Sequence, residues 1–301
     1  MAANPLPVNP GDATDAPRWG FTDEQLATQP HAFRDGLLDG QVCLVSGGGS
    51  GLGRAMAYLL TRLGAKVMIC GRRQDRLEAT AAGIERLLGR EIGYQAMTIR
   101  DPEQVNALVA ATWERFGGLD LLVNNGGGQF PQAAIDYSVK GWNAVIDTNL
   151  NGTWWMMQAA ARQWRDHGKP GSIVNIVANV WRGMPQVAHT CAARAGVIYL
   201  SKSVAIEWAP LGIRVNCVSP GSIATEGLNV YPPGAAETFG NANPLKIYGD
   251  AYDIAQSVVY VGAPVTGKFV TGEVVVVDGG NQMWGDVWPG GIPDWFCVPN
   301  R

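Results

Sequence analysis

Short apolar segments alternate with longer amphipathic segments from residue 41 to residue 280, and this alternation constrains the fold more than any other feature. The apolar segments have the length and composition of strands, whereas the amphipathic segments repeat their apolar residues at helical spacing. The expected strands are 42–46, 66–70, 94–99, 119–124, 172–177, 214–219 and 273–278. The expected helices are 52–63, 75–88, 102–116, a long one within 139–165, 192–209 and 253–261. Elements in this order predict a parallel sheet that helices cover on both faces.

These elements predict one large α/β domain. Right-handed crossovers wind the seven expected strands in two directions, which gives the doubly wound parallel sheet of the Rossmann fold. We expect this domain to span 37–280, with residues 226–250 as a lid over the substrate site. The flanking segments are predicted to be an N-terminal extension at 1–36 and a tryptophan-rich tail at 281–301.

The N-terminal extension carries signals of its own. Thr22 is followed three residues later by Gln25, which is the pattern of a helix N-terminus with reciprocal capping. Trp19 and Phe21 are expected to dock the extension onto the domain.

Composition and charge exclude several function classes. The formal net charge is −3 without a block of like charges, which argues against a nucleic-acid partner and a polybasic membrane surface. No apolar run has the length of a membrane-spanning helix. The five cysteines are scattered and form no CxxC pair, so free thiols are expected and a metal site is not. These features together predict a cytoplasmic protein.

A glycine-rich turn follows the first expected strand and leads into the first helix of the series. Glycines let the backbone approach a pyrophosphate, and the helix N-terminus supplies free N–H groups and a positive dipole end. The expected contacts are Ser46, Gly47, Gly49, Ser50, Gly51, Leu52 and Gly53. A flexible turn is the alternative, but the position between strand and helix favours a dinucleotide site.

The end of the second expected strand selects between the two nicotinamide cofactors. An NAD site usually has an acidic residue here for the ribose 2′-hydroxyl. This chain instead has Arg72 and Arg73, and a guanidinium suits a 2′-phosphate. We therefore predict NADP(H), with Arg72 as the main contact; the alternative is a pair of solvated arginines at a helix start.

In these residues the chain resembles the short-chain dehydrogenase/reductase family. The matching segments are 46–53, Asn124–Gly127, Asn149–Gly152, Gly171–Asn175, Pro220–Thr225 and Asp278–Gly280. The resemblance covers about residues 37–280 and implies a nicotinamide dinucleotide cofactor. Further cofactor contacts that it implies are Thr98, Ile99, Asn125, Gly126, Gly127, Asn149, Arg194, Pro220, Gly221, Ile223 and Thr225.

Two segments, 124–130 and 189–197, are also similar to peroxisomal trans-2-enoyl-CoA reductases and to bacterial citronellol/citronellal dehydrogenases. Residues 181–185 are similar to the bacterial group.

The catalytic positions depart from the family pattern of Asn, Ser, Tyr and Lys. Asn149 matches the Asn, whereas Ala178, Thr190 and Arg194 stand at the other three positions. Tyr199 and Lys202 lie nearby at the wrong spacing, so we expect both to be structural.

These substitutions disfavour ketone or alcohol chemistry, which needs an acid of tuned pKa at the oxygen. Reduction of a conjugated enoyl thioester instead needs hydrogen-bond donors where an enolate oxygen develops. Thr190 can supply one, and Asn179 and His189 are candidates for others, while Arg194 keeps a positive charge near the nicotinamide ribose. Each of three residues has an alternative interpretation. His189 can be a turn residue whose ring is hydrogen-bonded to the backbone, and Thr190 can be a small residue that packs under the nicotinamide. Asn149 can serve only to repair a kink in its helix.

The substrate is expected to be a small apolar or acyl-thioester molecule. Tyr231, Phe239 and Tyr248 give the lid an aromatic surface, although core or subunit contacts explain them equally well. Lys246 and Arg182 are the candidates for binding CoA phosphates, without an evident basic cluster.

Three functions remain open at this stage. The first is an NADPH-dependent reductase of an activated C=C bond, most simply of an enoyl-CoA. The second is an NADP-dependent dehydrogenase of an apolar or terpenoid alcohol. The third is a redox-inactive NADP(H)-binding protein. The family resemblance also implies a homotetramer or homodimer formed through the helices within 139–165 and 192–209.

Overall fold

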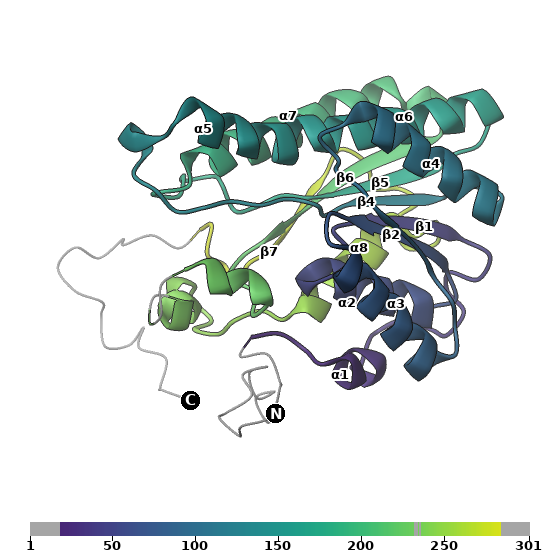
Figure 1. The fold of residues 1–301 in the computed structure, drawn as a ribbon, viewed down its shortest axis with the longest axis horizontal. Helices are drawn as coiled ribbons and strands as arrows, with labels where there is room; N and C mark the ends of the chain where they lie inside the picture. Colours follow the sequence, from purple (N-terminus) through teal and green to yellow (C-terminus); the bar gives the residue numbers. More distant parts are fainter. Residues whose placement is uncertain (1–18, 232–233, 235, 284–301) are drawn as a thin grey trace.

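The computed structural model describes residues 19–231, 234 and 236–283. Seven parallel strands form one sheet in the order β3-β2-β1-β4-β5-β6-β7 (Figure 1). The strands are β1 (Val42–Ser46), β2 (Lys66–Gly71), β3 (Gly93–Ala96), β4 (Leu121–Asn124), β5 (Gly171–Ile176), β6 (Ile213–Pro220) and β7 (Val274–Val277). The strand order reverses between β1 and β4, so the predicted doubly wound sheet is confirmed.

Helices cover both faces of this sheet. They are α1 (Asp23–Thr28), α2 (Gly51–Arg62), α3 (Gln74–Leu88), α4 (Pro102–Phe116), α5 (Val139–Ile146), α6 (Gly152–His167), α7 (Ala188–Glu207) and α8 (Ala251–Gly262). In Figure 1, α4, α5, α6 and α7 lie above the sheet, and α1, α2, α3 and α8 lie below it. Two large apolar clusters follow this division, because alternate residues of each central strand pack on opposite faces.

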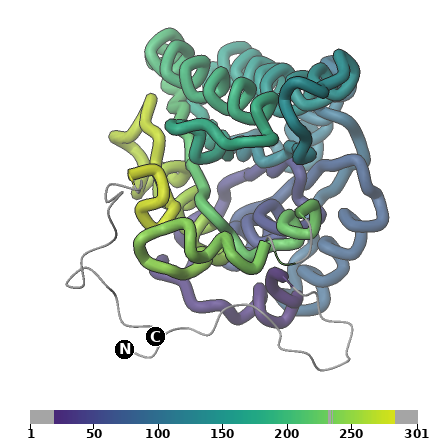
Figure 2. The backbone as a smooth tube through the Cα atoms, turned by 90° about the vertical axis from the view of Figure 1, so that its left-hand side faces the viewer, coloured from purple at the N-terminus to yellow at the C-terminus, as the bar shows by residue number. Residues whose placement is uncertain are grey.

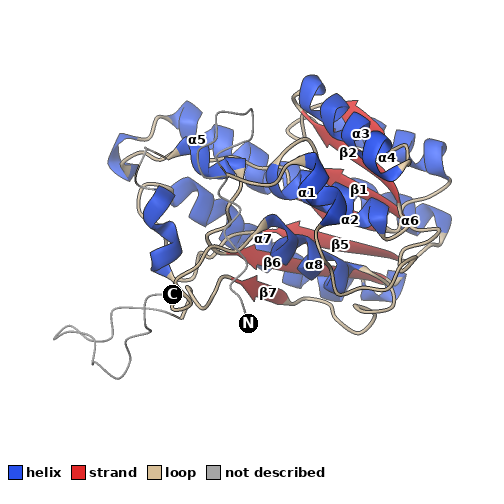
Figure 3. Cartoon of the chain, turned by 90° about the horizontal axis from the view of Figure 1, so that it is seen from below, coloured by secondary structure: helices blue, strands red, loops and turns tan. Residues whose placement is uncertain are grey.

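The functional segments gather at one end of the sheet. Short 3₁₀ turns η1 (Ala134–Asp136), η4 (Glu226–Val230) and η5 (Ala236–Ala242) follow β4 and β6, and η3 (Ala209–Leu211) links α7 to β6. Figure 3 shows that α5 lies beyond one end of the strands. This end holds the carboxyl termini of the strands, where open α/β sheets bind their ligands.

Three elements differ from the predicted ones by more than two residues at a boundary. The third strand ends at Ala96 instead of residue 99, because it is an edge strand whose partner β2 ends at Gly71. The long helix within 139–165 is two helices, separated by the π-helical turn η2 (Asp147–Asn151). Helix α7 begins at Ala188, four residues before the predicted start, which moves His189 and Thr190 from a loop into its first turn.

The N-terminal extension docks as expected over its described part. Trp19 and Phe21 are buried, and Thr22 and Gln25 form the reciprocal cap at the start of α1. Figure 2 shows this segment (purple) running close to the lid (green). Residues 1–18 and the tail from residue 284, with its tryptophans and Cys297, lie outside the described residues.

Three further features concern function classes. Cys43, Cys70, Cys191 and Cys217 are free thiols, and all but Cys191 are buried. Within the described residues, no helix combines the length and apolar character that crossing a bilayer requires. In the same part of the chain, no group of three or more His, Cys, Asp or Glu side chains is arranged to hold a metal ion.

Candidate cofactor and active site

The glycine turn between β1 and α2 is shaped for close approach of a ligand backbone. Gly47 and Gly51 have φ values of +69° and +50°, which side chains rarely adopt. A methyl group on Gly53 would lie 2.1 Å from the carbonyl oxygen of Gly47, and one on Gly48 would lie 2.5 Å from Cβ of Ile69. The N-cap residue Ser50 makes no side-chain cap, so the N-terminus of α2 keeps its free N–H groups. This turn therefore fits the diphosphate of a dinucleotide.

The loop after β4 braces the glycine turn from the side. The Ser46 hydroxyl accepts hydrogen bonds from the backbone N–H groups of Asn125 at 3.1 Å and Gly126 at 2.9 Å. The Asn125 side chain donates in turn to the carbonyls of Ser46 at 3.1 Å and Gly47 at 3.2 Å. Ser46 thus links the glycine turn to the loop after β4.

Basic side chains surround the loop after β2. Arg73 is committed to an ion pair with Asp75 at 2.7 Å. Arg72 and Arg76 are exposed and make no hydrogen bond or ion pair with the residues that the structure describes. A methyl group on Gly49 would lie 3.0 Å from Cβ of Arg76, so this arginine stands beside the glycine turn. The sequence prediction missed Arg76, although its place in the first turn of the next helix, one turn after Arg72, was a usable signal.

The remaining predicted cofactor contacts line the same edge. Ile99 packs against Gly126 and Gly152, and half-buried Thr98 receives its hydrogen bond from Arg100 N–H. Gly221 passes so close to Asp278 that a methyl group would lie 2.6 Å from its Cα. Thr225 lies over the glycine turn, because its hydroxyl oxygen would lie 3.8 Å from a methyl group on Gly51. Leu52 lies in the first turn of α2, and Pro220 is the last residue of β6. Ile223 forms an isolated parallel β-bridge with Gly249.

Arg194 and Asn149 meet beneath the loop after β4. Asn149 is buried in the π-helical turn, accepts from Gly128 N–H at 3.0 Å and donates to Gly128 C=O at 2.9 Å. Arg194 donates through Nη1 to the carbonyl of Ile176 at 2.9 Å. A methyl group on Gly127 would lie 2.2 Å from Nη2 of Arg194 and 3.1 Å from Oδ1 of Asn149. Burial lowers the pKa of Arg194 to about 10, so it stays a cation at neutral pH.

Thr190 and His189 form a buried pair at the start of α7. The Thr190 hydroxyl has no hydrogen-bond partner within the described residues and is almost fully enclosed. Its backbone N–H donates to Nδ1 of His189 at 2.8 Å. Because Nδ1 then acts as acceptor, the neutral ring carries its proton on Nε2, an atom without a partner within the described residues. Burial lowers the pKa of His189, which favours this neutral form.

Two aromatic rings enclose His189. Tyr137 stacks on it with centroids 4.6 Å apart and planes inclined by 6°, and Phe130 meets it edge-on at 4.6 Å. The Tyr137 hydroxyl donates to the carbonyl of Gln186 at 2.8 Å and accepts from Ala188 N–H at 3.0 Å. Tyr137 is thus a part of the site that the sequence prediction missed, because no local pattern links it to α7.

Other predicted residues have their hydrogen bonds and ring contacts elsewhere. Asn179 donates to Asp278 at 2.9 Å and to Asn281 at 2.8 Å, so both of its amide protons are engaged. Tyr199 is 66% exposed on the outer face of α7, where the Lys202 ammonium lies 5.3 Å from its ring. Both residues follow Thr190 by more than two turns of α7.

The described part of the predicted lid contacts the loop after β4. Gln129, in the loop after β4, donates to the Tyr231 hydroxyl at 2.6 Å. Tyr231, Phe239 and Tyr248 pack with Trp19 in a small apolar cluster. Of the two basic residues expected near CoA phosphates, Arg182 donates to the carbonyl of Asn281 and Lys246 to that of Asn241, at 2.8 and 2.7 Å.

Comparisons with known proteins agree with this geometry. A family profile described as Enoyl-(Acyl carrier protein) reductase matches residues 47–282. The chain belongs to the short-chain dehydrogenase/reductase family. It is accordingly an oxidoreductase, and the family uses a nicotinamide cofactor, in agreement with the glycine turn.

The relatives fall into two groups. Among curated proteins, the peroxisomal 2,4-dienoyl-CoA reductase of Danio rerio is 34% identical over 93% of this chain and 92% of its own length. The probable 2,4-dienoyl-CoA reductase of Bacillus subtilis is also 34% identical, over 82% of this chain and 98% of its own length. Among solved structures, a citronellol catabolism dehydrogenase of Pseudomonas aeruginosa has a TM-score of 0.74 and 37% identity, over 83% of this chain and 98% of its own.

Proposed function

We propose that this family member is an NADPH-dependent reductase of a C=C bond conjugated to a thioester, with an enoyl-CoA or dienoyl-CoA as substrate. The observation that carries the proposal is that Thr190 and Arg194 together replace the Tyr and Lys that the family usually has at these positions. The Thr190 hydroxyl is buried and unpartnered within the described residues, and Arg194 is a buried cation 8% exposed.

This pair suits stabilisation of an anion better than delivery of a proton. A threonine hydroxyl is a weak acid, and a guanidinium holds its proton at neutral pH. Ketone reduction needs a proton at the carbonyl oxygen, whereas reduction of a conjugated thioester builds negative charge on an oxygen that hydrogen bonds can stabilise. Tyr199, the nearest tyrosine in sequence, faces outward and does not replace the missing acid.

The chain's own residues then divide the work. The bound dinucleotide supplies the hydride that goes to the far carbon of the conjugated system. Thr190 donates a hydrogen bond to the thioester oxygen as charge collects there. Arg194 supplies fixed positive charge beside it, held by the Ile176 carbonyl. A proton added at carbon completes the reduction, and water or the Nε2–H of His189 is the donor to test.

The choice of NADPH rests on the arginines around the adenosine end. Arg72 and Arg76 are uncommitted within the described residues, whereas Arg73 is paired with Asp75. No acidic side chain follows β2 directly, where an NAD site would have one. The names of the curated relatives support an acyl-CoA substrate.

The test is a substrate panel with one readout, the absorbance of the reduced nicotinamide. We expect NADPH to be consumed with 2,4-dienoyl-CoA or trans-2-enoyl-CoA of medium chain length, and NADH to be used poorly. Formation of NADPH from NADP⁺ and citronellol, without enoyl reduction, would overturn the proposal in favour of an alcohol dehydrogenase. Tight NADPH binding without turnover on any of these substrates would indicate a redox-inactive cofactor-binding protein.

A further inference from the structure

A carboxylate lies beside the glycine turn, where the cofactor diphosphate is expected to bind. Glu226 is the first residue of the lid, and its Oε2 lies 3.4 Å from a methyl group built on Gly51. Gly51 is the first residue of α2, whose N-terminal N–H groups have no side-chain cap. Two anions that approach one helix N-terminus repel each other. A diphosphate bound at the N-terminus of α2 would therefore lie beside the negative charge of Glu226.

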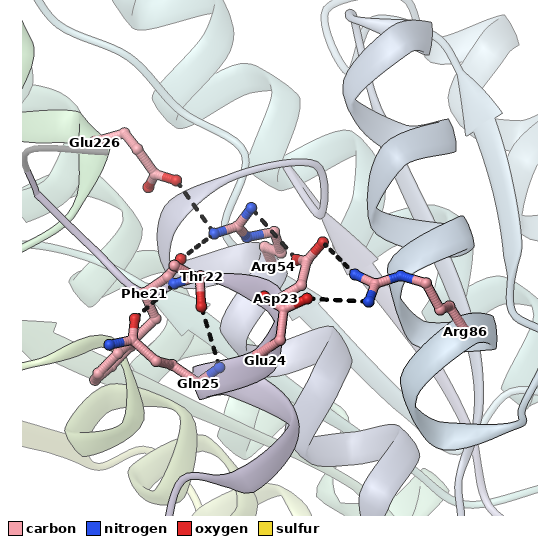
Figure 4. A network of polar contacts seen from close by, with 8 residues as sticks. All are labelled: Phe21, Thr22, Asp23, Glu24, Gln25, Arg54, Arg86 and Glu226. Carbon is pink, nitrogen blue, oxygen red and sulfur yellow. Dashed lines mark hydrogen bonds and ion pairs between the residues drawn. The ribbon is translucent and has the colours of Figure 1, made fainter. Parts of the chain in front are cut away.

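The counter-ion of Glu226 is shared with a second carboxylate. Arg54 lies one turn into α2. Its Nη2 is 3.6 Å from Oε1 of Glu226, and its Nη1 is 3.5 Å from Oδ1 of Asp23. The same guanidinium donates to the carbonyl of Phe21. Figure 4 shows Arg54 lying between Glu226 on one side and the N-terminal segment on the other.

The N-terminal segment is held in place independently of Glu226. Asp23 lies 4.0 Å from Arg86, and Glu24 pairs with the same arginine at 3.0 Å. Trp19 packs against Tyr248 of the lid with ring centroids 5.3 Å apart. Asp23 therefore remains a partner for Arg54 when Glu226 moves away, so displacement of Glu226 does not strand a half-buried cation.

We infer that Glu226 is an affinity-setting residue, which occupies the diphosphate position in the free protein and must withdraw when the dinucleotide binds. Because Glu226 begins the lid, its withdrawal moves the first turn of the lid as the cofactor enters. Displacing Glu226 costs free energy, which weakens cofactor binding. It also couples cofactor binding to the position of the segment that covers the substrate. The inference rests on the proposed function only in requiring a dinucleotide at the glycine turn, and not on the substrate or on the choice of NADPH.

The test measures dinucleotide binding by calorimetry, without substrate. Glu226→Gln removes the charge and keeps the size, and we expect it to bind NADPH roughly 3- to 30-fold more tightly than the unmodified protein. Raising the NaCl concentration from about 50 mM to about 0.5 M should shrink this difference, because salt screens exposed charges. Glu226→Ala serves as the second variant and should shift affinity in the same direction if the glutamine variant folds poorly.

Asp23→Asn gives the sharper contrast. This substitution also removes one negative charge, but Glu226 then becomes the only carboxylate that pairs with Arg54 among the residues described. Arg54 therefore holds Glu226 more firmly at the diphosphate position. We expect this variant to bind NADPH more weakly, opposite in sign to Glu226→Gln. Asp166→Asn, an exposed charge at the end of α6, is the matched control and should leave affinity unchanged.

Several outcomes would overturn the inference. They are unchanged or weaker binding by both Glu226 variants, equal tightening by Asp166→Asn, tightening by Asp23→Asn, and failure of every one of these proteins to bind NADPH or NADH. Failure to reduce enoyl thioesters, with the binding pattern intact, would count against the proposed reaction and leave this inference standing. Hydrogen exchange at residues 226–230 provides a second readout, and it should change on adding NADPH.

Discussion

The ring of Tyr137 stacks on that of His189 at 4.6 Å, while its hydroxyl bridges Gln186 and Ala188 at the start of α7. One side chain from the loop before α5 therefore fixes both the ring next to Thr190 and the backbone that precedes it. Gln186 has a φ of +68°, a conformation that non-glycine residues adopt at a cost. The bond from Tyr137 helps to hold this strained entry into the helix.

Replacing Tyr137 by Phe should separate these two contributions. The stack survives, but the Ala188 N–H loses its partner, so we expect the free energy of unfolding to fall by about 1–2 kcal/mol. Chemical denaturation measures this loss. Tyr94→Phe, at a position 41% exposed, is the control and should be nearly neutral. An unchanged stability in Tyr137→Phe would show that the bridge contributes nothing net.

His189 predicts a pH dependence of stability. Burial lowers its pKa below the ordinary value of 6.5. Between the lowered pKa and 6.5 the unfolded chain binds more protons than the folded one, so stability falls as pH drops through this window. Above it the contribution is complete. His31 shifts in the same direction, so unfolding curves of His189→Asn and the unmodified protein must be compared. A parallel pH dependence in both proteins would contradict this origin.

Thr190 is the sharpest test of the proposed chemistry. Thr190→Val keeps the shape and removes the hydroxyl, and loss of one donor to a developing oxyanion costs about 100- to 1000-fold in kcat. KM and NADPH affinity should change little, because the hydroxyl acts mainly in the transition state. Thr190→Ser should retain most of the rate. Full activity in Thr190→Val would remove Thr190 from the mechanism.

Two adjacent glycines provide a matched pair for the Arg194 site. A methyl group on Gly127 would lie 2.2 Å from Nη2 of Arg194, whereas one on Gly128 would meet nothing within 4 Å. Gly127→Ala should therefore displace the guanidinium, cost about 1–3 kcal/mol in stability and reduce turnover. Gly128→Ala keeps both backbone bonds to Asn149 and should behave like the unmodified protein. Equal behaviour of the two variants, in melting and in steady-state kinetics, would argue against a required position for Arg194.

Cofactor selectivity should depend on Arg72 more than on Arg73. Loss of a charge-assisted hydrogen bond costs about 1.5–3 kcal/mol, which corresponds to roughly 10- to 100-fold in the KM for NADPH. NADH kinetics should change little in Arg72→Ala, because NADH has no 2′-phosphate. Arg73→Ala is the control, since Asp75 already binds that side chain. An equal loss with both cofactors would show that Arg72 does not read the phosphate.

The sequence predicts the sheet because each strand is a short apolar run and each helix shows its own spacing, which are local properties. It predicts the glycine turn for the same reason. The start of α7 at Ala188 was missed because the Ala188 N–H is satisfied by the hydroxyl of Tyr137, which comes from a distant part of the chain. The commitment of Asn179 to Asp278 was likewise unreadable, since the two are 99 residues apart.

The turn at Asp147–Asn151 has a consequence for how this helical region changes with sequence. A π-helical turn holds one residue more than an α-helical turn, which shifts every later side chain by about 100° around the axis. Asn149 reaches Gly128 from inside this widened turn. Deleting one residue between Asp147 and Asn151 would restore a continuous helix and rotate the amide away from the loop. The extra residue therefore gives α5 and α6 different buried faces, so substitutions in one helix are constrained independently of the other. Asn149 lies where the two helices join.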